Sequence, residues 1–233
     1  MKQMIAMGGG GFSMEPDNLL LDQYILDQAN TTKPKICFVP TASGDSEGYI
    51  ERFYDAFTSL HCEPSHLSLF LPPTTDLEQY VMEKDIIYVG GGNTKNLLAL
   101  WREWELDRIL QKAWNHGIIM AGISAGANCW YEQCVTTSFG ETAASIPALG
   151  FYKGSYCPHF DGEVQRRPNF HTLLQSNDII PGYGVDDGVA LHYKENELHH
   201  IVSSRPEAKA YFLHTDQEGT VKEEMLAVTY LGK

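Results

Sequence analysis

The stretch Gly117-Ile118-Ile119-Met120-Ala121-Gly122-Ile123-Ser124-Ala125-Gly126-Ala127 lies just past the middle of the chain. Its apolar part predicts a buried strand at 118–121, and the residues that follow, 125–132, are suited to a helix. Between them, Gly-Ile-Ser-Ala-Gly fits the G-x-S-x-G pattern of a nucleophile elbow, a strained turn that exposes a serine above the carboxyl ends of the strands. The stretch therefore predicts an α/β fold, with Ser124 as either a nucleophile or an ordinary turn serine.

Apolar runs alternate with helical patterns over the first half of the chain. We predict buried strands at 4–7, 36–39, 67–71, 86–89 and 118–121, and helices near 17–29, 47–60, 76–82 and 93–116, the last as two helices. This alternation predicts a mostly parallel sheet flanked by helices in three layers. After about residue 185, short runs at 189–193, 198–202, 210–213 and 226–230 predict antiparallel strands that extend or flank the sheet. We expect one domain over residues 1–233.

Composition narrows the class of partner. The net charge of −13 argues against nucleic acid and against an anionic membrane surface, because both bind clustered Lys and Arg. The five cysteines form no C-x-x-C pair, the first 30 residues carry no signal pattern, and no apolar run reaches membrane-spanning length. We expect a cytoplasmic protein with reduced thiols. The sequence has no H-E-x-x-H and no clustered ligand spacing, so neither a metal nor an organic cofactor is expected.

Two glycine runs follow predicted strands. Gly90-Gly91-Gly92-Asn93-Thr94 comes one strand before the elbow, where its backbone N–H groups can supply an oxyanion donor beside the N–H of Ala125. The alternatives are a phosphate cradle, whose motifs are not matched, and a simple helix-capping turn. The earlier run, Gly8-Gly9-Gly10-Gly11, is assigned to the rim of the site.

A serine nucleophile requires a base, and the chain has nine histidines. His159 is the best placed of them, because it follows a predicted strand and a proline and comes 35 residues after Ser124. The rival histidines lie in the β-rich C-terminal part: His192, His199, His200 and His214.

These motifs together resemble the family of serine peptidases that contains α-aspartyl dipeptidase (dipeptidase E) and cyanophycinase. The resemblance runs through Gly90 to Thr94, Gly122 to Asn128 and Pro158-His159-Phe160, and covers the chain from about residue 1 to at least 190. It implies a fold like that of the class I glutamine amidotransferases, with serine in place of cysteine as the nucleophile. It also implies Ser124 as nucleophile, His159 as general base, and the N–H groups of Gly92 and Ala125 as the oxyanion hole.

The family places an acidic residue in the loop after the elbow helix, and Glu141 is the nearest carboxylate there. We therefore expect Glu141 to orient the imidazole, with Asp161, Asp186 and Asp187 as substitutes. Candidate substrate-binding residues are Asn93, Arg166 and Arg167. The arginines can bind a carboxylate bidentately, but Pro168 interrupts the helical pattern expected there, which puts an Asp-Xaa preference in doubt.

The resulting hypothesis is a serine peptidase, of exopeptidase or dipeptidase type, that hydrolyses small peptides through a Ser124–His159–Glu141 triad and an acyl-enzyme. Its expected partners are a small peptide substrate and, as an open alternative, a second copy in a homodimer. An α/β-hydrolase esterase is the second hypothesis, with His200 or His214 as base. The third is a non-catalytic ligand-binding module on an amidotransferase-like scaffold.

Overall fold

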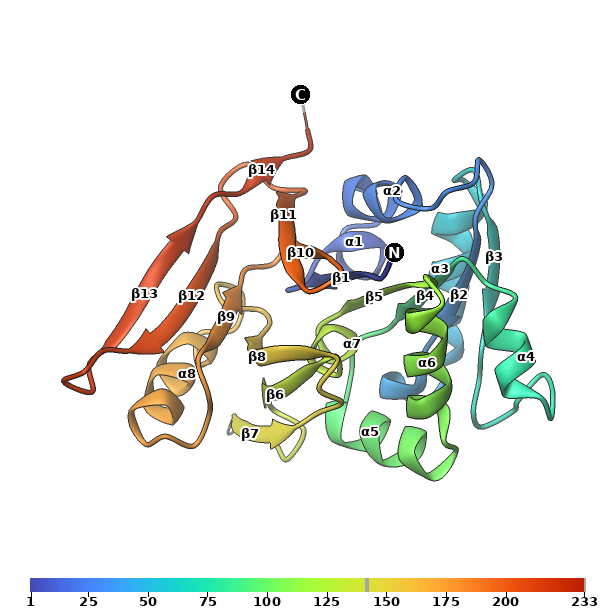
Figure 1. Cartoon of the computed structure of the whole chain (residues 1–233). Coiled ribbons are helices and arrows are strands. Elements are labelled where there is room, and N and C mark those ends of the chain that lie inside the picture. The colour runs from blue at the N-terminus through green and yellow to red at the C-terminus, as the bar shows by residue number, and fades with distance from the viewer. Residues whose placement is uncertain (141–142, 233) are drawn as a thin grey trace.

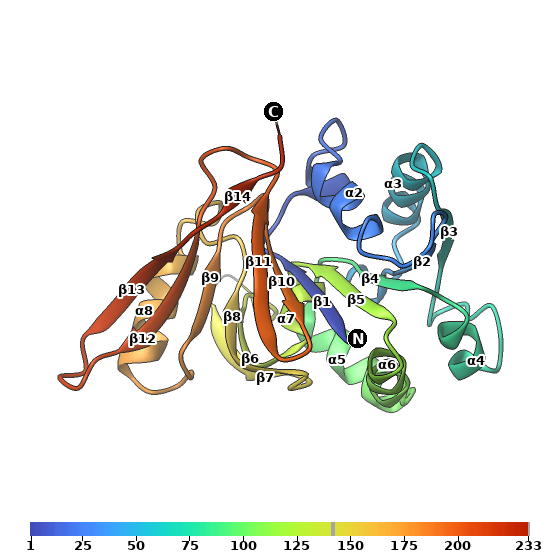
Figure 2. The ribbon, with the colours of Figure 1, turned by 45° about the horizontal axis from the view of Figure 1, so that its top comes forward.

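The computed structural model describes residues 1–140 and 143–232, and its larger sheet forms the centre of the molecule (Figures 1 and 2). Five of its strands run parallel, in the order β1 (Gln3–Met7), β5 (Ile119–Ile123), β4 (Ile86–Val89), β2 (Lys35–Val39) and β3 (Glu63–His66). On the other side of β1, the sheet continues through antiparallel β10 (Val189–Lys194) and β11 (Glu197–Ser203), and ends at the short β14 (Thr229–Tyr230). The predicted parallel core with antiparallel additions is confirmed.

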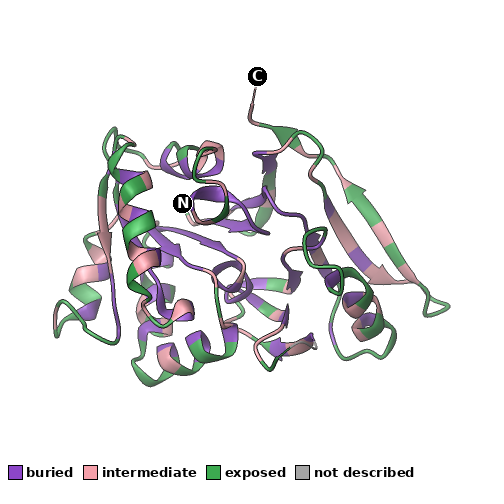
Figure 3. Cartoon of the chain, turned by 180° about the vertical axis from the view of Figure 1, so that it is seen from behind, coloured by how far each residue is buried: buried purple, intermediate pink, exposed green. Residues whose placement is uncertain are grey.

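Helices cover both faces of the parallel strands because alternate side chains of each strand point to opposite faces. Met4 and Ala6 of β1 join the apolar cluster under α4 (Leu77–Met82), α5 (Thr94–Glu103) and α6 (Leu106–Asn115). Ile5 and Met7 join the cluster under α1 (Gly11–Met14), α2 (Leu20–Leu26) and α3 (Glu47–Thr58). Figure 3 shows the central strands buried and the outer faces of the helices exposed.

A second sheet lies beside the first and was not predicted as a separate layer. Its strand order is β13 (Val221–Leu226), β12 (Ala210–Thr215), β9 (Gly182–Val185), β8 (Tyr152–Cys157), β6 (Tyr131–Thr136) and β7 (Ala144–Pro147). Helix α8 (Arg166–Gln175) packs on it through Phe170 and Leu174. The predicted C-terminal strands thus divide: β10 and β11 extend the main sheet, whereas β12 and β13 belong to the second sheet.

Three local predictions were wrong. Residues 67–71 are not a strand, because Asp45 Oδ2 accepts hydrogen bonds from the N–H groups of Leu69 and Phe70 and draws this segment into a turn after β3. The helix expected at 125–132 is the single turn α7 (Ala125–Asn128), after which the chain enters β6. The strand expected at 226–230 is split between the end of β13 and β14.

The buried face of α2 carries a carboxylate. Asp22 is fully buried, and this burial raises its pKa from the usual 3.8 to about 7, with the charge of Glu15 adding to the rise. The folded protein therefore holds a proton on Asp22 over a pH range in which the unfolded chain has released it. Because the unfolded chain releases this proton at a lower pH, the free energy of unfolding falls as the pH rises from about 4 to about 7.

We predict that Asp22→Asn removes this loss, because the amide has no proton to release. The free energy of unfolding of the variant should exceed that of the parent by a margin that grows between pH 4 and pH 7, up to about 4 kcal/mol. Urea unfolding at a series of pH values measures this margin. The control is Asp17→Asn at an exposed position, and a margin for Asp22→Asn that does not vary with pH would contradict the prediction.

Candidate active site

Ser124 lies on the turn between β5 and α7 in a backbone conformation that side chains other than glycine rarely adopt, with φ 54° and ψ −112°. The flanking glycines make this turn possible. A Cβ on Gly122 would lie 2.1 Å from the carbonyl oxygen of Gly126, and one on Gly126 would lie 2.2 Å from that of Val89. The strand and the one-turn helix therefore meet backbone to backbone, and the sequence pattern describes the observed elbow.

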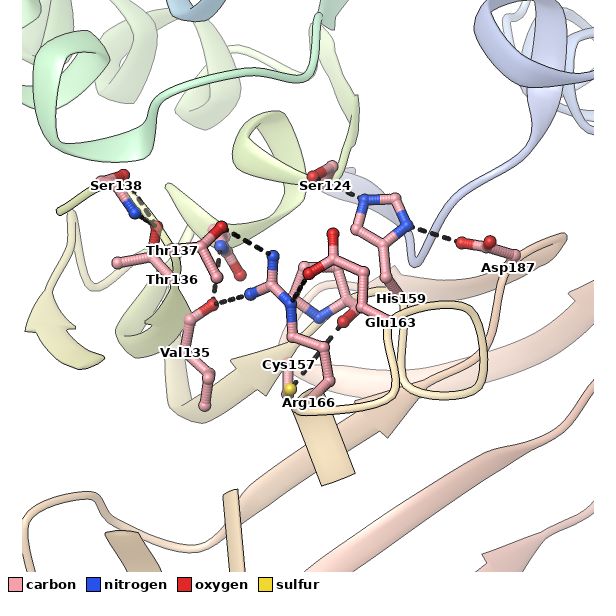
Figure 4. A network of polar contacts seen from close by, with 12 residues as sticks. Ser124, Val135, Thr136, Thr137, Ser138, Cys157, His159, Glu163, Arg166 and Asp187 are labelled. Atoms are coloured by element: carbon pink, nitrogen blue, oxygen red, sulfur yellow. Dashed lines mark hydrogen bonds and ion pairs between the residues drawn. The ribbon is translucent and has the colours of Figure 1, made fainter. Parts of the chain in front are cut away.

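His159 meets Ser124 from the loop after β8. Its Nε2 atom lies 2.9 Å from Ser124 Oγ, and it too has a positive φ, of 52° (Figure 4). The rival histidines lie elsewhere. His192 and His200 contact Tyr24, His199 stacks on His200, and His214 bonds to Glu224. The structure thus brings together the serine and the histidine that the sequence singled out.

The carboxylate at the imidazole is Asp187. Its Oδ1 atom lies 2.6 Å from His159 Nδ1, and both side chains are largely buried. A carboxylate can only accept, so Nδ1 carries the hydrogen and Nε2 is left free to accept from the serine hydroxyl. Asp187, one of the three substitutes, is thus the carboxylate that the structure places at the imidazole. Glu141 itself lies outside the described residues.

Other carboxylates surround Asp187. Asp161 Oδ1 accepts a hydrogen bond of 2.8 Å from the Asp187 N–H. Burial, together with the charge of Asp161, raises the pKa of Asp186 to about 6, although the N–H of Lys209 acts in the opposite direction. Three carboxylates, those of Asp161, Asp186 and Asp187, are therefore grouped beside the candidate base His159.

The glycine run after β1 packs against the histidine–aspartate pair. A Cβ on Gly9 would lie 1.9 Å from Asp187 Oδ1 and 3.0 Å from His159 Nδ1. Gly162 is similarly close, because its Cβ would lie 2.4 Å from Asp187 Oδ2. The run is predicted from the sequence to lie at the rim of the site. Its contact with the imidazole is not predicted there, although four consecutive glycines after a strand are a signal of a close approach by the backbone.

The loop after β4, which contains Gly91 and Gly92, also lies close to Ser124. A Cβ on Gly91 would lie 3.9 Å from Ser124 Oγ. The N–H of Gly91 donates to the Tyr49 hydroxyl and that of Asn93 to the Ala42 carbonyl, whereas the Gly92 N–H between them has no acceptor among the described residues. Gly92 has φ 138°, and a Cβ there would lie 2.2 Å from the Ala42 oxygen. This conformation is open only to glycine.

The three candidate substrate-binding residues are all engaged within the protein. Asn93 caps α5 by accepting from the Asn96 N–H, and its amide donates to the Ser138 carbonyl. Arg166 is buried and bonds to Glu163. Arg167 bonds to Glu223 through two nitrogens and lies over the rings of Phe160 and Tyr211. Pro168 lies in the first turn of α8, where its missing N–H costs no helical hydrogen bond.

In the part of the chain that the structure describes, no cluster of three or more His, Cys, Asp or Glu side chains is arranged to hold a metal ion. No helix in these ranges has both the length and the apolar character needed to cross a membrane.

The fold and the site are typical of a serine hydrolase, with the candidate nucleophile Ser124 on an elbow at the end of a parallel strand. A model of peptidase family S51 matches residues 4–201, and the chain belongs to this family. It is 59% identical over the full length of both chains to a protein of Bacillus subtilis described as uncharacterized peptidase YgaJ. It is also 27% identical to peptidase E of Haemophilus influenzae, covering 80% of this chain and 81% of that one.

Two solved structures share the fold. A peptidase from an acI-B1 Actinobacterium superposes with a TM-score of 0.69 at 21% identity, covering 98% of this chain and 95% of that one. A putative peptidase E from Listeria monocytogenes gives 0.60 at 18% identity, covering 97% and 100%. Family and fold together confirm the expected α/β class and the serine-type peptidase, and they favour a peptidase over the esterase and the non-catalytic module.

We predict that Gly9→Ala strongly reduces peptide hydrolysis while the protein still folds. The new methyl group would overlap Asp187 Oδ1 and force the His159–Asp187 pair apart, and displacements of this size lower rates by about 10²-fold. Gly48→Ala is the control, because its methyl group would meet nothing closer than 3.8 Å. Rates of peptide cleavage and thermal unfolding are compared for both variants, and equal activity of the two would count against this packing.

Proposed function

We propose that Ser124, His159 and Asp187 form the catalytic triad of this peptidase and that it hydrolyses small peptides through an acyl-enzyme. The observation that supports this proposal is the continuous chain of two hydrogen bonds, 2.9 Å from Ser124 Oγ to His159 Nε2 and 2.6 Å from His159 Nδ1 to Asp187 Oδ1. A nucleophile within reach of a base that a third group orients is the arrangement that acyl transfer requires.

In the first half of the reaction, Ser124 Oγ attacks the scissile carbonyl carbon while His159 Nε2 takes the hydroxyl proton. The imidazolium that forms is stabilised by the Asp187 carboxylate at Nδ1. His159 then gives this proton to the leaving amine as the carbon–nitrogen bond breaks, and the acyl group stays on the serine oxygen. In the second half, His159 takes a proton from a water molecule, which attacks the ester and releases the acid.

The tetrahedral intermediates carry a negative charge on the former carbonyl oxygen. We assign its donors to the N–H groups of Gly92 and Ala125. The loop of Gly92 lies against Ser124, the Gly92 N–H has no acceptor in the described ranges, and Ala125 directly follows the nucleophile at the start of α7. One such donor contributes about 10² to 10³-fold to the rate.

The proposal also covers the type of peptidase, its substrate preference and its cellular compartment. A dipeptidase or other exopeptidase action on small peptides is consistent with the names of the relatives, since the Haemophilus protein is called peptidase E. A preference for Asp-Xaa peptides has little support, because Arg166 and Arg167 both pair with glutamates of the protein. The five cysteines are all free and buried, which supports a reducing compartment such as the cytoplasm.

A fluorophosphonate probe tests the nucleophile, since it reacts only with an activated serine. We expect the parent protein to be labelled at Ser124, and both Ser124→Ala and His159→Ala to remain unlabelled and to lose hydrolysis by several orders of magnitude. Peptide mapping of the labelled protein identifies the site. Labelling that persists in His159→Ala and is lost in His200→Ala or His214→Ala would instead support the esterase mechanism.

Replacement of Asp187 by Asn tests the third member of the triad. The amide would favour the wrong imidazole tautomer, so kcat should fall by about 10⁴-fold while KM changes little. The corresponding variant Glu141→Gln is the matched control and should leave kcat nearly unchanged. Steady-state rates of both variants decide the point, and a larger loss in Glu141→Gln than in Asp187→Asn would restore the original assignment.

A further inference from the structure

Three of the four N–H groups in the run from Gly90 to Asn93 are held by the rest of the protein. Those of Gly90 and Asn93 donate to backbone carbonyls, at 3.1 and 2.8 Å. The Gly91 N–H donates to the Tyr49 hydroxyl at 3.2 Å. The Gly92 N–H has no acceptor among the residues that the structure describes, so it is the one left for the oxygen of a substrate.

The contact with Tyr49 differs from the other two because its acceptor is a side chain. Glycine places little limit on its own φ and ψ, so contacts from outside the run must fix the direction of each peptide plane. Tyr49 lies in α3 and fixes the peptide of Gly91. The Gly92 N–H belongs to the next peptide, one Cα atom further along the chain.

The Tyr49 hydroxyl is itself held in one place. The side chain is buried, and its ring packs against the rings of Phe38 and Phe12, with centroids 5.0 and 5.6 Å apart. A Cβ on Gly90 would lie 3.1 Å from Cε1 of the same ring. Burial raises the pKa of the Tyr49 phenol above its usual 10, so the hydroxyl is uncharged at neutral pH.

The peptide that Tyr49 holds lies against the nucleophile. A Cβ on Gly91 would lie 3.4 Å from Ser124 Cβ and 3.9 Å from Ser124 Oγ. A rotation of this peptide would therefore move the neighbouring Gly92 N–H relative to Ser124. An oxyanion donor works only when its N–H points at the place where the charge develops, and a displacement of about 1 Å can lower a rate by about 10²-fold.

We propose that Tyr49 is a positioning residue of the oxyanion hole, whose hydroxyl holds the Gly91 peptide so that the Gly92 N–H faces the substrate oxygen. The proposal rests on the proposed function, in which Ser124 is the nucleophile and Gly92 a donor. Tyr49 acts through the loop and does not touch the substrate. Because the charge on the oxygen develops only during the reaction, loss of the hydroxyl lowers kcat and leaves KM nearly unchanged.

The variant Tyr49→Phe tests the proposal, because it removes the hydroxyl and keeps the ring that packs in the core. The fluorophosphonate probe provides the measurement. Ser124 Oγ displaces fluoride from phosphorus, and the phosphonyl oxygen gains negative charge in the transition state as a substrate carbonyl oxygen does. We expect the maximal labelling rate constant of Tyr49→Phe to fall by about tenfold or more, with the half-saturating probe concentration nearly unchanged. The kcat for peptide hydrolysis should fall with it.

Tyr54→Phe is the matched control. Tyr54 lies in the same helix, and its hydroxyl is 2.8 Å from His66 Nδ1, at the edge strand β3. This variant also loses one hydroxyl contact, but away from the glycine run, and should be labelled at the rate of the parent. Both variants are assayed below their thermal unfolding temperatures.

A labelling rate constant of Tyr49→Phe no lower than that of Tyr54→Phe overturns the proposal. A loss that appears in the half-saturating concentration instead of the rate constant also overturns it, because the hydroxyl would then act in binding. In both cases a parent labelled at Ser124 leaves the proposed function intact. A parent that is not labelled overturns the assignment of the nucleophile and, with it, the role of Tyr49.

Discussion

The hydrogen bond between His159 and Asp187 is the interaction on which the arrangement of the site depends, because it holds the loop after β8 to the connection between the two sheets. Ser124 follows β5 in the larger sheet, and His159 follows β8 in the smaller one. Asp187 lies on the connection by which the chain passes from β9 in the smaller sheet to β10 in the larger. The three side chains can meet only when the sheets hold one relative position, so the second sheet is part of the site.

The end of β1 fixes both partners of the proposed proton transfer. The Met7 carbonyl accepts from the Ser124 N–H at 3.1 Å, and the next carbonyl, that of Gly8, accepts from the His159 N–H at 3.2 Å. Both donors have positive φ angles, which cost energy unless the surrounding structure holds them. Adjacent residues of one strand end thus stabilise two strained backbones at once. Glycine follows β1 because a side chain at position 9 would occupy the space of the carboxylate.

Much of this arrangement could be predicted from the sequence where the signal is local. The elbow around Ser124 and the glycines before Asn93 are short patterns, each set by the strand that precedes it, and their close approach follows from parallel strands ending at one edge. His159 was predicted from its place after a strand and from the family resemblance. Asp187 was not the first choice, because its contact with His159 spans 28 residues and depends on how β9 and β10 divide between two sheets.

The errors in the fold have similar causes. The apolar run at 67–71 has the composition of a strand, but its backbone N–H groups bond to Asp45, 24 and 25 residues earlier, and no local pattern reveals that contact. The division of the C-terminal strands between two sheets also depends on long-range pairing, since β12 pairs with β9 and β10 pairs with β1. Alternating apolar residues predict that a strand has a buried face, but they do not identify the sheet that it joins.

The charges around His159 connect the chemistry of the site with its choice of substrate. In the proposed mechanism the imidazole becomes positive, and the Asp187 carboxylate at Nδ1 stabilises that charge. This carboxylate and those of Asp161 and Asp186 beside it repel an acidic substrate. The nearby cations do not offset this repulsion, because Arg166 is paired with Glu163, Arg167 with Glu223 and Arg205 with Glu15. We therefore expect these carboxylates to favour peptides without a negative side chain, unless one of these cations is released from its partner.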